Sequence, residues 1–191
     1  VQVDLVEANT AQLTERLFSG SLDLLIDNKH MDPAVYQKSF FSEEHLLLAV
    51  PTRLAVNEKM KNYALTASDI RENRHLNSRI PPVPLENFQN ESFLLLKSGN
   101  DTRSRADRIC HNAHIIPKVK LELDQQITAY NLSRYGMGIS FCSDTLVRHV
   151  PDDEGLVYYK LNHQDALREV NFYYKRNRYM SRIVATFLDM I

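Results

Sequence analysis

The chain has 191 residues, of which 43% are hydrophobic and 25% are charged, and its 23 Lys and Arg against 24 Asp and Glu give a net charge of −1. This composition excludes a collagen-like or wholly disordered chain, and the near-neutral charge argues against a self-standing nucleic-acid-binding protein. No apolar run approaches the roughly 18 residues of a membrane-spanning helix, so we expect one soluble domain or two small lobes.

The first residues have the pattern of a strand, a helix and a second strand. Residues 1–5 alternate between apolar and polar side chains, which predicts a strand. Asn9 is placed to cap a helix, with Gln12 as its capping-box partner and Gly20 at its end. The apolar run 22–26 then predicts a parallel strand that is covered on both faces. Because a strand pattern begins at the first residue without a Met, we expect a domain cut from a longer chain.

The middle of the chain is less regular. The apolar run 45–50 predicts a strand, and a polar helix is predicted over 68–76. Three prolines then follow between positions 81 and 84. Because such a cluster is incompatible with regular helix and sheet, it predicts a linker between two lobes.

Strands and helices alternate again after the prolines. In chain order we predict a strand at 93–97, a helix at 102–113, a strand at 119–123 with Asp124 as the next helix cap, a helix at 125–134 closed by Gly136, a strand at 139–141, a helix capped by Ser143, strands at 156–161 and 170–174, and a helix at 181–191. The alternation predicts an α/β fold with largely parallel sheets.

An ordered set of short motifs resembles the effector-binding domain of the LysR-type transcriptional regulators. In the first part it consists of Glu7-Ala8-Asn9-Thr10 and Leu17-x-x-Gly20-x-Leu22-Asp23-Leu24-x-Ile26. In the second part it consists of Phe93-Leu94-Leu95-Leu96, a helix with Cys110, Pro117 before a strand, and Tyr135-Gly136-Met137-Gly138-Ile139-Ser140-Phe141. The motifs keep the family's order over nearly the whole chain.

The resemblance implies an α/β fold of two Rossmann-like lobes with a ligand cleft between them, as in type 2 periplasmic binding proteins. It places lobe I at residues 1–86 and 162–191 and lobe II at 87–161. It also implies that the domain senses a small-molecule effector, and that a homodimer or homotetramer transmits the signal to an upstream winged-helix DNA-binding domain that this chain lacks.

Two departures from the family pattern stand out. The strand and helix with which the family domain normally begins would lie before Val1. The stretch between Pro51 and Phe93 is longer than the family's, which predicts an inserted loop and helix.

The candidate effector-binding residues lie mainly at helix starts. In open α/β sheets, ligands bind at the carboxyl ends of strands, where helix N–H groups converge, and such junctions are predicted at 9–10, 98–102 and 124–128. The family positions and these junctions together give Thr10, Asn28, Ser98, Asn100, Asp101, Thr102, Gln125 and Thr128. Thr10 and Thr102 are expected to face one another from opposite lobes. The alternative is that Asn9, Asp101 and Asp124 are helix caps only.

These residues do not decide whether the effector is an anion or a cation. Helix N–H groups favour an anion, whereas the carboxylate of Asp101 would select an amine or a hydroxyl.

Two cysteine positions invite other chemistry. Cys110-His111-x-x-His114 contains zinc-ligand types, but on a helix His111 lies about a quarter-turn from Cys110 and no second ligand cluster accompanies it. A peroxide sensor of this family would need a reactive Cys where Asp101 stands. We therefore predict no metal site and expect Cys110 and Cys142 to be buried packing residues.

No sequence signal points to catalysis or to a cofactor. The nucleophile elbow, the P-loop and the dinucleotide fingerprint do not occur, and Gly136-x-Gly138 lies on the wrong side of a strand to cradle phosphate. Arg103, Arg105 and Arg108 have acidic neighbours on one helix, which is typical of a solvated face; the alternative for Arg103 is ligand binding.

The remaining functional alternatives follow from these signals. We predict no enzyme and no cofactor, and the two cysteines of the chain favour a reducing, cytoplasmic location. The alternative function is a free-standing solute-binding protein of the same fold.

Overall fold

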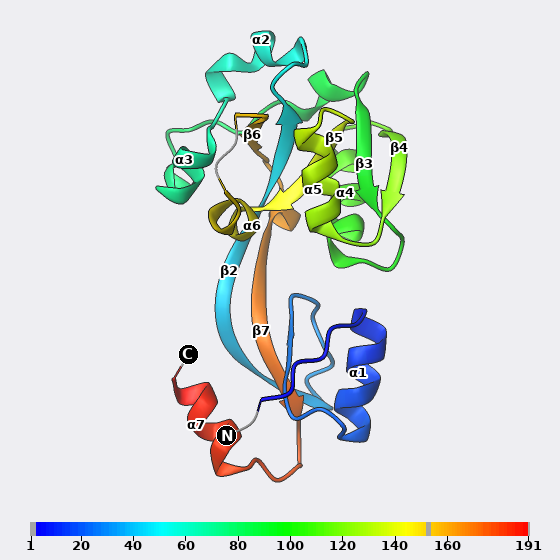
Figure 1. Ribbon diagram of the computed structural model, residues 1–191, viewed down its shortest axis with the longest axis vertical. Helices are drawn as coiled ribbons and strands as arrows, with labels where there is room; N and C mark the ends of the chain where they lie inside the picture. The colour runs from blue at the N-terminus through cyan, green and yellow to red at the C-terminus, as the bar shows by residue number, and fades with distance from the viewer. Residues whose placement is uncertain (1–2, 152–153, 191) are drawn as a thin grey trace. The chain divides into compact units, whose positions relative to one another are not determined.

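The computed structural model describes residues 3–151 and 154–190, and most of its helices and strands are labelled in Figure 1. The chain forms two compact units. The smaller contains the residues up to Glu43 together with those from Arg168 onward, and the larger contains Glu44–Leu167. These boundaries differ from the lobes predicted at 1–86 with 162–191 and at 87–161, because the segment 44–86 packs within the larger unit.

The smaller unit is built around three strands that are neighbours in the sheet order. Its elements are helix α1 (Thr10–Ser19), strand β1 (Leu25–Asp27), the first part of β2 (Tyr36–Pro51), most of β7 (Leu167–Lys175) and helix α7 (Arg182–Asp189). As predicted, the Asn9 side chain caps α1 by accepting a hydrogen bond from the Gln12 backbone N–H at 3.0 Å, and Gly20 ends the helix with φ +85°. The core consists of Leu17, Leu25, Met31, Tyr36 and Tyr173.

Two strand predictions in this unit are wrong. The described residues 3–9 contain no strand, and the side chains of Val3 and Leu5 are 80% and 93% exposed. The run 22–26 forms only the three-residue β1, which pairs antiparallel with β7 and leaves Ile26 half exposed. The faces of a buried parallel strand are covered by helices, whereas β1 is an edge strand whose neighbour in the sheet order, β7, runs antiparallel to it.

The larger unit alternates strands with short helices. After the second part of β2 its elements are α2 (Val56–Met60), η1 (Lys61–Tyr63), α3 (Ala67–Arg71), η2 (Arg74–Leu76), η3 (Leu85–Phe88), β3 (Ser92–Leu96), α4 (Asp101–Asn112), β4 (Lys118–Leu123), α5 (Gln126–Arg134), β5 (Ile139–Ser143), α6 (Asp144–His149), β6 (Leu156–Lys160) and η4 (Gln164–Ala166). None of the helices in the described part of the chain is long and apolar enough to span a membrane.

The sheet of the larger unit is mixed, which corrects the prediction of largely parallel sheets. Its strand order is β6-β2-β5-β3-β4, in which β3 runs parallel to β4 and β5 while β2 runs antiparallel to β5 and β6. The α/β class itself is confirmed.

Helices cover both faces of this sheet (Figure 1). Phe93 and Leu95 of β3 share a core cluster with Ile109 of α4, whereas Leu94 and Leu96 share another with Ala129 of α5. Because successive strand residues point to opposite faces, α4 and α5 pack on opposite faces of β3. Since α4 follows β3 and α5 follows β4, and these strands are parallel, both helices begin at the edge of the sheet where the strands end.

The segment before β3 is part of the core rather than a linker between the units. Ile70 is fully buried, and the Val83 backbone N–H donates to the Lys160 carbonyl at 2.8 Å. The helix predicted over 68–76 is divided, because Asn73 adopts a left-handed φ of 58° between α3 and η2. The long stretch between Pro51 and Phe93 thus consists of short helices packed on the larger unit.

Candidate functional site

Two of the predicted strand–helix junctions lie at the same edge of the sheet. Strands β3 and β4 are parallel neighbours, α4 follows β3, and α5 follows β4. Lys97, just after β3, donates its backbone N–H to the Leu123 carbonyl at 2.8 Å and pairs its ammonium with Asp124 at 2.8 Å. The structure therefore brings six of the eight candidate residues to one edge: Ser98, Asn100, Asp101, Thr102, Gln125 and Thr128.

These six residues differ in exposure and in their local role. Ser98, Gln125 and Thr128 are exposed, Asn100 and Asp101 are half-buried, and Thr102 is only 5% exposed. The Asn100 side chain caps α4 by accepting from the Thr102 N–H at 2.8 Å. The hydroxyl groups of Ser98 and Thr128 and the amide group of Gln125 are therefore the ones open to solvent at this edge.

Asp124 does not cap α5, contrary to the prediction. Gln125 holds the N-cap position without a side-chain cap hydrogen bond, and Asp124 instead forms the ion pair with Lys97. This pair joins the two junctions to one another.

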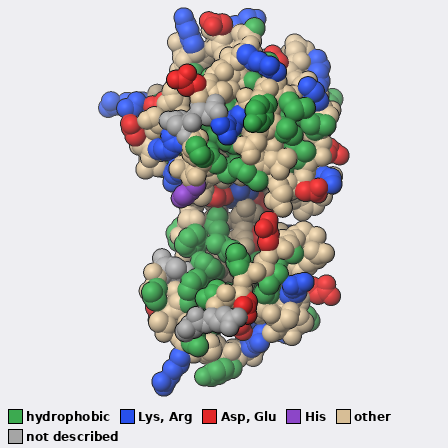
Figure 2. All heavy atoms as spheres, viewed as in Figure 1, with side chains coloured by type: hydrophobic (Ala, Val, Ile, Leu, Met, Phe, Trp, Pro, Cys, Tyr) green, Lys and Arg blue, Asp and Glu red, His purple; other side chains and the backbone are tan. Residues whose placement is uncertain are grey.

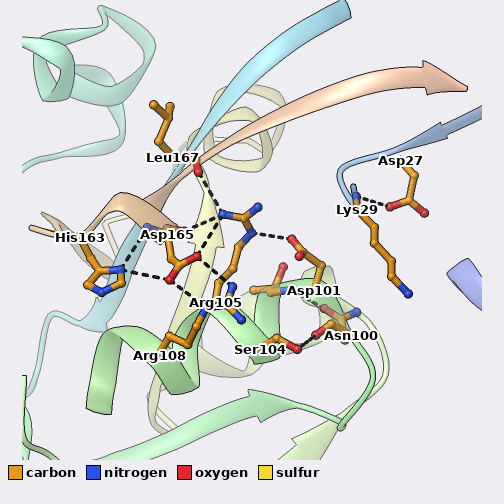
Figure 3. Close-up of polar contacts among 11 residues, drawn as sticks. Asp27, Lys29, Asn100, Asp101, Ser104, Arg105, Arg108, His163, Asp165 and Leu167 are labelled. Atoms are coloured by element: carbon orange, nitrogen blue, oxygen red, sulfur yellow. Dashed lines mark hydrogen bonds and ion pairs between the residues drawn. The ribbon is translucent and has the colours of Figure 1, made fainter. Parts of the chain in front are cut away.

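Arg105 connects the start of α4 to the last residue of the larger unit (Figure 3). Its Nε donates to Asp101 Oδ2 at 2.7 Å, and its Nη1 donates to the carbonyls of Asp165 and Leu167 at 3.1 and 3.0 Å. The side chain of Arg105 is only 16% exposed, and that of Asp101 is 20% exposed. The negative charge of Asp101 is thus compensated by a fixed guanidinium.

A second ion pair holds the segment before β7. Both carboxylate oxygens of Asp165 accept from Arg108, at 2.8 and 2.9 Å, and His163 Nδ1 lies 3.3 Å from Asp165 Oδ2. The hydrogen bonds from Arg108, together with the charges of Arg108, His163 and Arg105, hold the pKa of Asp165 below its usual value. The same partnership raises the pKa of Arg108.

Of the three arginines of α4, Arg108 is exposed as predicted, whereas Arg103 and Arg105 are largely buried. Arg103 is 16% exposed, and it donates through Nε to both oxygens of Asp107 and through Nη1 to the Leu96 carbonyl and to Glu122. The hydrogen bond to Glu122 contributes most to the raised pKa of Arg103. With these donors already used, Arg103 is a poor candidate for ligand binding.

The other two candidate residues belong to the smaller unit. Thr10 is the first residue of α1 and is half-buried, and its carbonyl accepts from the Thr14 hydroxyl at 2.7 Å. It does not follow a strand, because the described residues before it are irregular. Asn28 follows β1 in a bend and is half-buried. That these two residues share a site with the others stays a prediction.

Both cysteines are free and buried, as predicted. Burial raises the pKa of the Cys110 thiol to about 12, with a smaller contribution from Asp107, and burial likewise raises that of Cys142. His111 and His114 are exposed. These surroundings favour inert packing cysteines over reactive thiols.

One cluster of chemically active side chains has no signal in the sequence. His45, His75 and Asp144 meet in the larger unit, although they come from three elements far apart in the chain. Metal-ligand spacings are recognisable in a sequence only when the ligands are local, so only a fold could reveal this group.

Figure 2 shows how charged and apolar side chains are spread over one face. Basic and acidic groups are interspersed there, in keeping with the net charge of −1. In the smaller unit, an aromatic row places the rings of Phe41 and Phe172 at 5.3 Å and those of Phe172 and Phe187 at 5.6 Å. Phe41 and Phe187 remain 42% and 41% exposed.

The whole chain, residues 1–191, matches the family model of the LysR substrate binding domain. The chain therefore belongs to the LysR substrate-binding domain family. This confirms the predicted family and supports the reading of the chain as a regulator domain rather than an enzyme or a free-standing solute-binding protein.

The relatives and solved structures agree with that family. An uncharacterized HTH-type transcriptional regulator of Bacillus subtilis (strain 168), YcgK, is 24% identical over 190 residues, which cover 100% of this chain and 57% of that protein. The CcmR regulatory domain of Synechocystis PCC6803 in complex with 2-PG has a TM-score of 0.78 at 19% identity, over 99% of this chain and 81% of that one. The effector binding domain of QuiR in complex with shikimate has a TM-score of 0.70 at 14% identity, over 95% and 76%.

What this chain shares with the solved structures is the fold. At such identities the solved structures show the fold alone, and that fold is the one predicted from the sequence. The chain spans just over half the length of the curated relatives that it matches.

Proposed function

We propose that this chain is the effector-sensing domain of a LysR-type transcriptional regulator. Its family membership supports this function, and its curated relatives are HTH-type transcriptional regulators of which it covers 57%. DNA binding then belongs to a part of the protein outside these residues. The working regulator is proposed to be a homodimer or homotetramer in the cytoplasm, where it reaches its operator.

The effector is proposed to bind at the edge formed by residues 98–102 and 125–128. The observation that carries this assignment is that two parallel neighbouring strands each end there in a helix start with exposed polar side chains. In α/β sheets this edge is where ligands bind. Thr10 and Asn28 are the proposed contribution of the smaller unit.

A small anion suits this edge best. The N–H groups at the start of the twelve-residue helix α4 favour negative charge, and the one carboxylate among them, Asp101, is neutralised by Arg105. Two similar structures are complexes, one with 2-PG and one with shikimate. We therefore propose small carboxylates as the first effectors to test.

The signal is proposed to pass through Arg105. This side chain touches Asp101 at the candidate site and the carbonyl of Leu167, after which the chain leaves the larger unit. A ligand that changes the Asp101–Arg105 pair acts directly on that departure point. Such a ligand shifts the equilibrium between the states with and without this pair only as far as its affinities for the two states differ.

The test is a thermal-shift screen with carboxylates, amino acids, sugars and nucleosides. A ligand at 100 times its Kd stabilises the folded chain by about 2.7 kcal/mol. The variants Ser98→Ala and Thr128→Ala change exposed side chains, so they should keep the melting temperature of the free chain and reduce the shift that the ligand causes. Ser78→Ala, another exposed serine, is the matched control. A ligand whose shift is the same in all three variants would place the site elsewhere.

A further inference from the structure

Three elements of the larger unit bring two imidazoles and a carboxylate together. His45 lies on β2, His75 in η2 and Asp144 in the first turn of α6, and one potential ligand atom from each lies within 4.8 Å of the others. His75 Nε2 is 2.9 Å and His45 Nδ1 is 3.5 Å from the same oxygen, Asp144 Oδ2. The side chains of His75 and Asp144 are 1% and 0% exposed, while that of His45 is 28% exposed, so the cluster opens to solvent on one side.

The backbone fixes the carboxylate in this cluster. Asp144 Oδ1 accepts the N–H groups of His45 and Thr145, both at 2.9 Å. Burial alone would raise the pKa of Asp144, but the hydrogen bonds from His45 and His75 and the charge of Arg148 hold it well below its usual value. Two backbone N–H groups thus fix the position of this buried carboxylate.

Asp144 Oδ2 is the acceptor that the side chains of the cluster share. Arg148 Nη2 donates to Asp144 Oδ2 at 2.7 Å, so one oxygen faces three nitrogen atoms. Within the described part of the chain, Arg148 Nε and His75 Nδ1 are buried without a hydrogen-bond partner. Buried polar groups in native proteins are nearly always paired, so these two atoms are exceptions, and neither is one of the nitrogen atoms of His45 and His75 that face Asp144.

We propose that His45, His75 and Asp144 bind a transition-metal dication of the Zn²⁺ type, with solvent as the fourth ligand. Two imidazoles and one carboxylate form a common three-ligand zinc set that leaves one coordination position open. Ligand bonds of 2.0–2.2 Å in a tetrahedron separate the ligand atoms by about 3.4 Å. The two observed separations, 2.9 and 3.5 Å, are close to that value. In this proposal the dication replaces Arg148 as the positive charge next to Asp144, and the Arg148 side chain, which is 31% exposed, moves into solvent.

Asp144 follows β5, a parallel neighbour of β3, so the cluster lies next to the proposed effector edge, but it shares no residue with that edge and the two proposals are tested by different variants. Binding of an ion would join η2, in the long segment before β3, to β2 and α6. The immediate consequence is a metal-dependent increase in the stability of the larger unit.

The experiment titrates the chelator-treated 191-residue chain with Co²⁺, which reports tetrahedral binding through visible absorption, and then displaces it with Zn²⁺. We expect one equivalent to bind, and we expect His45→Gln and His75→Gln to lose the absorption. His149→Gln, an exposed histidine on α6, is the matched control and should bind like the parent. Absence of binding, or equal loss of binding in the control, would overturn the proposal.

A further variant separates metal binding from a purely structural cluster. Because Arg148 competes with the ion for Asp144, Arg148→Met should bind Co²⁺ about tenfold more tightly than the parent. His45→Gln changes a partly exposed side chain, so its melting curve serves to show that loss of binding is not loss of folding. Unchanged or weaker binding by folded Arg148→Met would contradict the proposed competition.

Discussion

Replacing Arg105 by Ala removes the connection between the start of α4 and the last residue of the larger unit. The change eliminates one ion pair of 2.7 Å with Asp101 and two hydrogen bonds to the carbonyls of Asp165 and Leu167. Because Arg105 is only 16% exposed, the carboxylate and the carbonyls it leaves are poorly placed to recover all three bonds with water. We expect the free energy of unfolding to fall by about 2–3 kcal/mol.

Arg108→Ala is the matched control, since it removes the same side chain one turn further along α4. Arg108 also forms two hydrogen bonds to Asp165, but its side chain is 53% exposed. Solvent screens such a pair, so the expected loss is about 0.5–1 kcal/mol.

Urea unfolding followed by circular dichroism measures both variants. With a slope of about 2 kcal/mol per molar urea, Arg105→Ala should lower the midpoint by about 1 M and Arg108→Ala by less than about 0.5 M. If Arg105→Ala costs no more than Arg108→Ala, then the contacts of Arg105 do not anchor Leu167 and the proposed route of the signal fails.

Three further predictions follow from the same structure. The lowered pKa of Asp165 stabilises the fold at pH values above its unfolded pKa of about 3.9, and this contribution is lost as the pH falls through the lower folded value; Asp165→Asn should therefore be less stable in urea at pH 7 and show a shallower loss below pH 4. Thr66→Ala removes the capping box with Asp69 and should cost about 1 kcal/mol in the same assay. Gly138→Ala would place a Cβ 2.7 Å from the Ser92 carbonyl oxygen and should lower the melting temperature through a loss of about 1–3 kcal/mol.

Local signals in the sequence predicted most elements of the fold. Asn9, Gly20 and Ser143 act at helix ends as their residue types indicate, because a cap needs only the next few residues. The strand expected at residues 1–5 was wrong over the described residues 3–5, since a strand depends on a pairing partner that periodicity does not reveal.

Strand direction and unit boundaries depend on distant contacts. Nothing in the apolar run of β2 shows that it pairs antiparallel with β5 and β6 at once. The sequence around the proline cluster likewise does not show its distant contacts, so it was predicted to be a linker, although Val83 is hydrogen-bonded to Lys160 of β6. Proline excludes regular structure locally, but it does not show which core a segment joins.

The candidate site was predictable only in part. The polar residues that follow β3 and β4 could be grouped because parallel neighbouring strands end at one edge, which is a rule of the fold class. The burial of Thr102 and the pairing of Asp124 with Lys97 could not be predicted from the sequence, because both depend on tertiary packing. The same holds for His45, His75 and Asp144.

The two charged clusters of the larger unit stand at the two places where the chain enters and leaves it. The chain passes between the units after Glu43 and after Leu167. His45, the second residue of the larger unit, is fixed through its N–H to Asp144, and Leu167, the last, is fixed through its carbonyl to Arg105. Since the units are joined covalently only at these two crossings, a change in either cluster acts on a covalent connection rather than on a surface alone. A ligand that contacts Asp101 is one side chain away from the second crossing, and an ion bound by His45 would sit at the first.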